Sequence, residues 1–243
     1  MKNDPYIVAA FLKAQDQGAS ADGTNPIVTI SRQHGTPSEL IAVRTAEILT
    51  EMSHGQHPWI AVNKDIAERV ISDHHLPRQT AHFLTGEHTV SIEDYVEGLL
   101  GISVSREKVV EKMVQTLIHL ARLGHVVFVG RAAHVVTARF PRAAHIRLIG
   151  SFERRVERVM ESNGCSRDEA AYEIREVDEK RRTFTAKHFG VDLDDPTHFD
   201  LIFNTDRMSA EEAARLIAHL VASPDFRKKE ASQLVELRHQ VLG

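Results

Sequence analysis

The stretch VTISRQHGTPSELIAVRTAEIL, residues 28–49, decides the fold class. It reads as a short strand rich in β-branched residues, a polar turn and an amphipathic helix. In a parallel α/β sheet, such a junction presents backbone N–H groups and the positive end of a helix dipole at the carboxyl edge of the strands. Residues 31–39 occupy that position and are the first candidate for an anion site.

The turn departs from the full phosphate-loop pattern G-x-x-x-x-G-K-S/T, in which glycines let the backbone wrap phosphates and a lysine reaches their oxygens. Aligned by the strand end, Arg32, Pro37 and Ser38 stand at the first glycine, the second glycine and the lysine. Gly35 remains inside the loop. Residues 36–39, TPSE, also read as a capping box with proline at the first helical position, and its glutamate would oppose an anion. The residues alone therefore favour a plain helix start over a phosphate site.

More strand-then-helix units follow along the chain. Short β-rich runs occupy residues 59–62, 125–130, 144–150 and 201–205. The helix predicted over residues 105–123 has apolar side chains at i, i+3, i+4 and i+7. Repeated strand–helix units predict an α/β fold with three layers, α/β/α, in which helices cover both faces of a parallel sheet.

Two later helix starts carry a clear signature. Residues 166–169 (SRDE) and 209–212 (SAEE) both have the S-x-x-E pattern of a capping box. In this motif the serine and the glutamate each bond a backbone N–H of the other. The chain is expected to begin a helix at each of these positions.

Composition and charge narrow the function classes. The chain has 243 residues, a formal net charge of −4 and one cysteine, Cys165. These values indicate a globular protein without an intrachain disulfide, and they do not favour nucleic acid as a partner. No apolar run approaches the roughly 20 residues that cross a bilayer, so we expect no membrane contact and a cytoplasmic location. Self-association into a homo-oligomer is left open.

Four segments in order carry a resemblance to a known family. They are ISRQHG at residues 30–35, VVFVGRAAHVV at 126–136, RLIGSFERRVERV at 147–159, and the charged stretch 178–205. Together they resemble the cytidylate kinase-like family, a branch of the P-loop nucleoside monophosphate kinases. The resemblance implies a P-loop nucleoside-triphosphate-hydrolase-like fold. It also implies phosphoryl transfer from ATP to CMP or a related small acceptor, with Mg²⁺ held mainly through the nucleotide phosphates.

Residue patterns at the two ends and the resemblance in between together divide the chain. The parts are an N-terminal helix and linker (1–25), the kinase-like domain (26–224) with an acceptor-binding insert at about 63–104 and a helical lid at about 151–196, and a C-terminal helix (225–243).

The resemblance also implies roles for individual residues. Catalytic roles fall on arginines of the G-R turn and of the lid: Arg131, Arg155, Arg158, Arg181 and Arg182. Cofactor binding falls on the loop residues Arg32, Gly35, Thr36 and Ser38. Substrate binding falls on Lys64, Asp65, Arg131 and Asp178. Ala132 stands where the classical enzymes keep an acidic residue.

The charged lid segment also has a pattern of its own. Arg175, Asp178 and Arg182 fall at i, i+3 and i+7, so a carboxylate on one helix face could hold arginines in place. The planar guanidinium stays charged and binds phosphate oxygens in pairs. A solvated, salt-bridged helix face is the alternative interpretation.

Two other function classes stay open. Pro37, Ser38 and Glu39 favour a catalytically inactive, nucleotide-binding regulatory protein on the same fold. A His-based metal hydrolase would have to use residues 73–75 (DHH), with His82 and His88 nearby. Adjacent histidines on a helix diverge by about 100°, so we do not expect side chains of this segment to bind a metal.

Overall fold

The computed structural model describes residues 25–62, 106–130, 132–223 and 226. Within them, five parallel strands form one sheet in the order β2-β3-β1-β4-β5. The strands are β1 (Ile27–Arg32), β2 (Ile60–Val62), β3 (Val126–Val129), β4 (Ala143–Ile149) and β5 (Leu201–Asn204). Each predicted strand is present within about two residues of its expected ends, which is the usual uncertainty of such boundaries.

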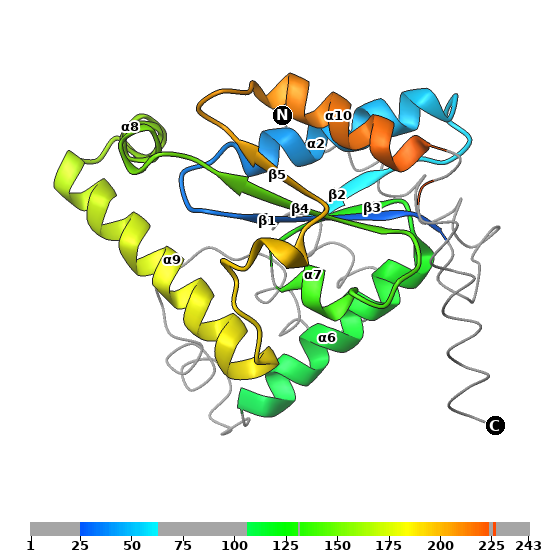
Figure 1. Ribbon diagram of the computed structural model, residues 1–243, viewed down its shortest axis with the longest axis horizontal. Coiled ribbons are helices and arrows are strands. Elements are labelled where there is room, and N and C mark those ends of the chain that lie inside the picture. Colours follow the sequence, from blue (N-terminus) through cyan, green and yellow to red (C-terminus); the bar gives the residue numbers. More distant parts are fainter. Residues whose placement is uncertain (1–24, 63–105, 131, 224–225, 227–243) are drawn as a thin grey trace.

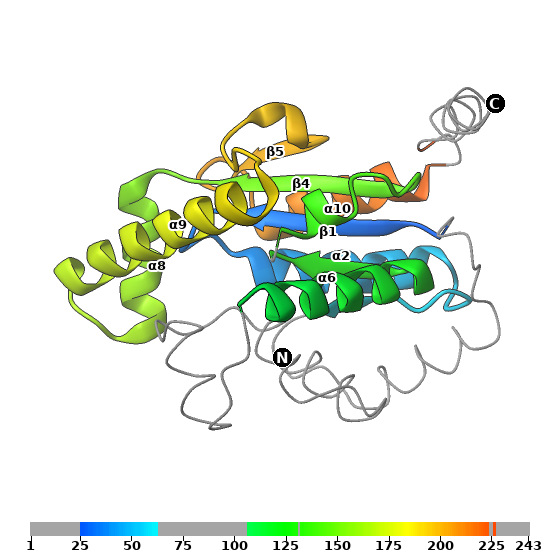
Figure 2. The same cartoon turned by 90° about the horizontal axis from the view of Figure 1, so that it is seen from below.

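Helices cover both faces of this sheet, as predicted (Figures 1 and 2). The helical elements are α2 (Ser38–Met52), α6 (Arg106–Leu123), α7 (Ala133–Val136), α8 (Phe152–Asn163), α9 (Arg167–Phe189), the 3₁₀ turn η1 (Pro196–His198) and α10 (Ala210–Ala222). Helices α2 and α10 pack against each other over one face, while α6 and α7 lie on the other. The expected three-layer α/β/α class is confirmed.

Side chains of β1 alternate between two apolar cores. Val28 and Ile30 belong to the core beneath α2 and α10, whereas Ile27 belongs to the core beneath α6 and α7. Thr29 and Ser31 share the face of Ile27 but are polar, and both are buried. The α6/α7 face therefore becomes polar toward the carboxyl end of β1, where the site lies.

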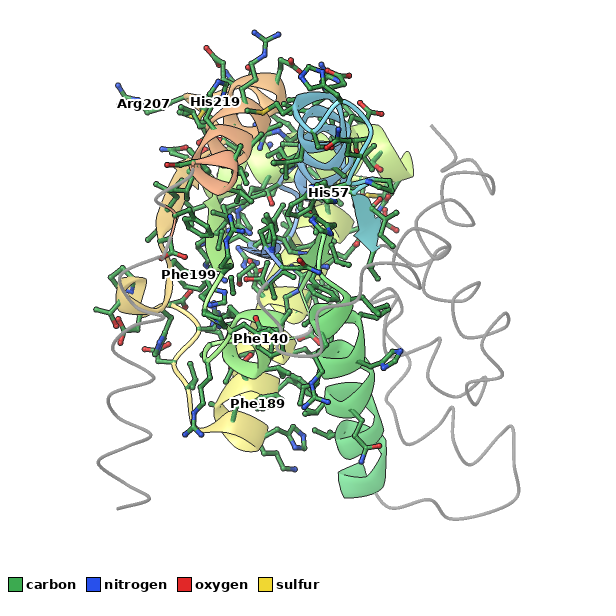
Figure 3. The ribbon with its side chains drawn as sticks, turned by 90° about the vertical axis from the view of Figure 1, so that its right-hand side faces the viewer. His57, Phe140, Phe189, Phe199, Arg207 and His219 are labelled. Atoms are coloured by element: carbon green, nitrogen blue, oxygen red, sulfur yellow. The ribbon has the colours of Figure 1, made fainter. Side chains whose placement is uncertain are left out.

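Helix α9 lies beside the carboxyl edge of the sheet (Figure 1). It leaves α8 through a turn at Gly164, which has the left-handed conformation (φ 65°), and runs back toward α6 (Figure 1). Phe189, at its end, packs on the α6/α7 core together with Phe140, and Figure 3 shows both rings on that side of the molecule. Both ends of α9 are therefore fixed, one to α8 and one to α6.

The capping predictions had mixed outcomes. Ser166 and Ser209 each cap a helix within a complete capping box, as predicted. The box expected at residues 36–39 is wrong, because Pro37 is itself the cap residue of α2 and makes no side-chain capping bond. The Thr36 hydroxyl instead donates to the Gln33 carbonyl, 2.8 Å away, inside the preceding turn. Local bonding within the turn competes with capping for the same hydroxyl.

Several predictions lie outside the described residues. These are the N-terminal helix, the acceptor-binding insert with its histidines, Lys64, Asp65, Arg131 and the C-terminal helix. Among the residues that are described, no helix combines the length and the apolar character that a membrane crossing requires.

Candidate anion-binding site

The turn between β1 and α2 is tied to the neighbouring strand β4. The Gln33 N–H donates to the Leu148 carbonyl at 3.0 Å, and the Gln33 side-chain oxygen accepts from the Gly150 N–H at 3.0 Å. These bonds pair the turn with the end of β4 as an extension of the sheet. The turn therefore has one fixed position at the carboxyl edge, where ligands of parallel α/β sheets bind.

Gly35 lets α8 approach this turn closely. Its φ is +81°, and a Cβ built there would stand 2.7 Å from the backbone oxygen of Arg155 in α8. Both the backbone conformation and the contact exclude a side chain. The loop and α8 consequently touch through backbone atoms.

Arg155 joins the loop to α8 and α9. Its guanidinium donates to the carbonyls of Gly150 (3.2 Å) and His34 (3.0 Å), and to the Asp178 carboxylate of α9 (2.6 Å). The residue is only 7 % exposed. A buried guanidinium with three oxygen partners positions the backbone around it, so Arg155 orients the loop.

The Asp178 carboxylate completes this arrangement. Its second oxygen accepts from the backbone N–H of His34 at 2.7 Å, and Arg181 lies 3.7 Å from the same oxygen. Arg181 also donates to the Arg32 carbonyl at 3.2 Å. A loop amide and two guanidinium groups thus surround one carboxylate, the donor set that binds anions.

The His34 ring makes a further link between the loop and α9. Its Nε2 lies 2.8 Å from Glu173 Oε1. Burial lowers the pKa of His34, Arg181 lowers it further, and Glu173 opposes both. His34 therefore contacts α9 through both its backbone and its side chain.

The arginines predicted as catalytic separate into distinct groups. Arg155 and Arg181 meet at Asp178, whereas Arg158 donates to the Thr205 carbonyl (2.8 Å) beyond β5. Arg182 lies 3.1 Å from Glu179 and 3.7 Å from Asp194. Of the four that the structure describes, it therefore brings two side chains together and places two elsewhere, while Arg131 lies outside the described residues.

The helical pattern of α9 predicted that Asp178 holds arginines in place. Asp178 does so, but its partners are Arg155 and Arg181. Arg175 lies over the Phe152 ring, 5.0 Å from its centre, and not against Asp178. Arg182 likewise pairs elsewhere. The prediction that Asp178 holds Arg175 and Arg182 is therefore wrong, because α8 and the loop provide closer partners than the helix's own surface.

Comparison with known proteins identifies the family. The model of the Cytidylate kinase-like family matches residues 27–207, which include the loop, helices α8 and α9 and every strand described above. The chain belongs to the cytidylate kinase-like family.

Individual relatives of this cytidylate kinase-like chain are distant. It is 32 % identical over 69 residues to a cytidylate kinase of Staphylothermus marinus, covering 28 % of this chain and 38 % of that one. It is 31 % identical over 108 residues to a cytidylate kinase of Pyrobaculum aerophilum, covering 44 % and 58 %. The aligned part thus spans less than two thirds of either relative. A crystal structure of an uncharacterized protein from Eubacterium ventriosum has the same fold, with a TM-score of 0.58, 16 % identity and coverage of 82 % of this chain and 99 % of that one.

The loop of this family member fits a phosphate oxygen on chemical grounds. The His34 N–H and the Arg155 guanidinium both donate to the Asp178 carboxylate, so the loop backbone and Arg155 can hold an anionic oxygen. Thr36 and the buried Ser38 lie on the same loop, and the Arg32 guanidinium covers Gly130 at the end of β3. Among the residues described, no group of three or more histidine, cysteine, aspartate or glutamate side chains is arranged to hold a metal ion.

A second polar cluster, around Arg147, was not predicted from the sequence. Arg147 of β4 is buried, and its guanidinium donates to the Ser31 hydroxyl (2.9 Å) and the Asp194 carboxylate (2.6 Å). Burial lowers the pKa of Arg147, and Asp194 opposes the shift. The Phe199 ring lies against both Arg147 and His134, with 5.0 Å between the centres of the two rings. The sequence signal for this cluster was Arg147 itself, a charged residue in β4, a strand buried on both faces where apolar residues are the rule.

Proposed function

We propose that this chain is an ATP-dependent nucleoside monophosphate kinase-like enzyme that phosphorylates CMP or a related small acceptor. The observation that carries the proposal is the meeting of the His34 amide, Arg155 and Arg181 around a single anionic group at the carboxyl edge of the sheet. Membership of the cytidylate kinase-like family supports the reaction class. No nucleic acid or membrane partner is part of this proposal.

The residues of the site suit phosphoryl transfer because that reaction needs positioning and positive charge more than covalent chemistry. The His34 amide and the two guanidinium groups would hold phosphate oxygens. Arg155, through its bonds to the His34 and Gly150 carbonyls, would keep the loop aligned with β4. Bound ATP with Mg²⁺ would supply the phosphoryl group and the metal charge.

Arg181 offers a direct test of the proposal. A coupled assay with ATP, Mg²⁺ and a panel of nucleoside monophosphates should detect turnover with CMP or a close relative. Replacing Arg181 by methionine should lower kcat about 100-fold, the usual cost of losing one charged group that stabilises the transition state. The exposed Arg154, on α8, is the matched control for removing a positive charge from the lid. Turnover that is equal in both variants would reject the role of Arg181.

A second candidate is an inactive nucleotide-binding regulator on the same fold. It is favoured by Ser38, which stands at the lysine position and has its side chain buried at the start of α2. ATP binding without turnover for any acceptor would select this candidate over the kinase.

A further inference from the structure

We propose that Asp178 is an internal anion that occupies the anion-binding position of the loop, and that a nucleotide phosphate must displace it to bind. The inference rests on the proposed function, because it assigns the ligand of the loop to the phosphate class. It adds a competition between the protein's own carboxylate and the substrate.

The contacts of Asp178 are those of a bound phosphate oxygen pair. One oxygen takes the His34 N–H at 2.7 Å and the other takes the Arg155 guanidinium at 2.6 Å. The residue is 8 % exposed, so these donors satisfy it in place of water. A phosphate that bonds the same amide and guanidinium cannot do so while the carboxylate remains, because like charges at this distance repel strongly.

The packing of α9 allows such an exchange. Its apolar contacts lie at its two ends, where Ala170 and Ile174 pack on α8 and where Phe184 and Phe189 pack on the α6/α7 core. Between them, the buried Asp178 holds the loop through polar contacts alone. Polar contacts can be exchanged for equivalent ones at little net cost, whereas an apolar core cannot be opened cheaply.

The exchange leaves no buried charge without a partner. Arg155 and Arg181 face the carboxylate before the exchange and would face the phosphate after it. The Asp178 side chain would turn away from the loop while both ends of α9 stay packed. In the ligand-free chain, the carboxylate therefore weakens nucleotide binding by the free energy of its own bonds.

The test compares ATP binding by calorimetry in the full chain and in two variants of α9. Asp178→Asn removes the charge from the loop amide and from Arg155. Glu173→Gln removes the same charge from the same helix and also touches His34, but only at the ring. We expect Asp178→Asn to bind ATP about tenfold more tightly, since it loses a charge-assisted competitor, and Glu173→Gln to stay within about twofold of the parent chain.

A second readout follows the loop itself. The His34 amide should exchange its hydrogen faster in ligand-free Asp178→Asn than in the parent chain, with Glu173→Gln unchanged. If Asp178→Asn does not fold, Asp178→Glu retains the charge on a longer arm, and a smaller gain in ATP affinity is expected.

The outcomes separate this inference from the proposed function. ATP binding by the parent chain, with no gain in any folded Asp178 variant or an equal gain in Glu173→Gln, would overturn the internal anion and leave the kinase proposal standing. Failure of every chain to bind ATP would overturn both.

Discussion

Gly35 shows how a single residue couples the loop to α8. Its φ of +81° and its contact with the Arg155 backbone oxygen leave no room for a side chain. Gly55 has a similar φ of +73° with nothing within 4 Å of its Cβ position, so it isolates the cost of the conformation. We expect Gly55→Ala to lower the free energy of unfolding by about 1 kcal/mol and Gly35→Ala by about 3 kcal/mol, as measured by urea denaturation. Equal losses would show that α8 can retreat from the loop.

Ser38 is a loop residue whose replacement should change nucleotide binding. It stands where a phosphate loop carries its lysine, and its side chain is buried at the start of α2. The double variant Pro37→Gly, Ser38→Lys should bind ATP about tenfold more tightly, because an ammonium group placed beside phosphates gains a charge-assisted bond. Pro37→Gly alone is the control for loosening the turn. A double variant that binds no better than this control would mean that the turn now serves only to start the helix.

Side-chain partners were the part of the site that spacing could not predict. Helical periodicity placed Arg175, Asp178 and Arg182 on neighbouring positions, which is correct. It could not show that Phe152 of α8 would take Arg175, or that the loop would take Asp178. Both partners come from distant parts of the sequence, and tertiary contacts of this kind override pairings within a helix.

At the scale of elements, α9 and α10 begin with the same motif but have different surroundings. Ser166 and Ser209 each accept the N–H of a glutamate in a complete capping box. Helix α10 buries Ala213, Ala214, Ile217, Ala218 and Val221 in the core shared with α2. Helix α9 buries far less apolar surface. The same local signal therefore begins a helix buried in the main core, α10, and a helix packed mainly at its two ends, α9.

Because α9 and α10 are packed differently, we expect loss of the serine cap to have different effects on the two helices. Ser209→Ala should lower the global free energy of unfolding by about 1 kcal/mol, the usual cost of losing a cap. Ser166→Ala should instead lower the local opening energy of the first turns of α9 by a similar amount, because a helix end can fray without unfolding the sheet. Urea denaturation reports the first effect and hydrogen exchange of α9 amides reports the second. A larger global loss from Ser166→Ala than from Ser209→Ala would contradict this division.

For the whole molecule, strand identity was predictable but strand order was not. Each strand carries its own local signal of β-branched residues followed by a turn, and repeated strand–helix units imply parallel pairing. The order β2-β3-β1-β4-β5 depends on which face each connecting helix covers. That choice is made by packing between segments far apart in the chain, as when α10 pairs with α2. The polar half of the α6/α7 face follows from this order, which brings Ser31 beside Arg147.

Buried histidines make the stability of the whole chain sensitive to acid. Burial, aided by His145, His198 and Arg147, lowers the pKa of His134 to about 3, and burial with His57 and Arg142 lowers that of His125 to about 4. Below the ordinary value of 6.5 the unfolded chain binds these protons and the folded chain does not, so stability falls as pH falls. Each histidine should contribute a loss of about 1.4 kcal/mol per pH unit between about pH 6 and pH 4. Urea denaturation across this range should show a shallower pH slope for His134→Gln than for the parent chain. Parallel slopes for the parent and His134→Gln would mean that His134 takes up its proton without unfolding.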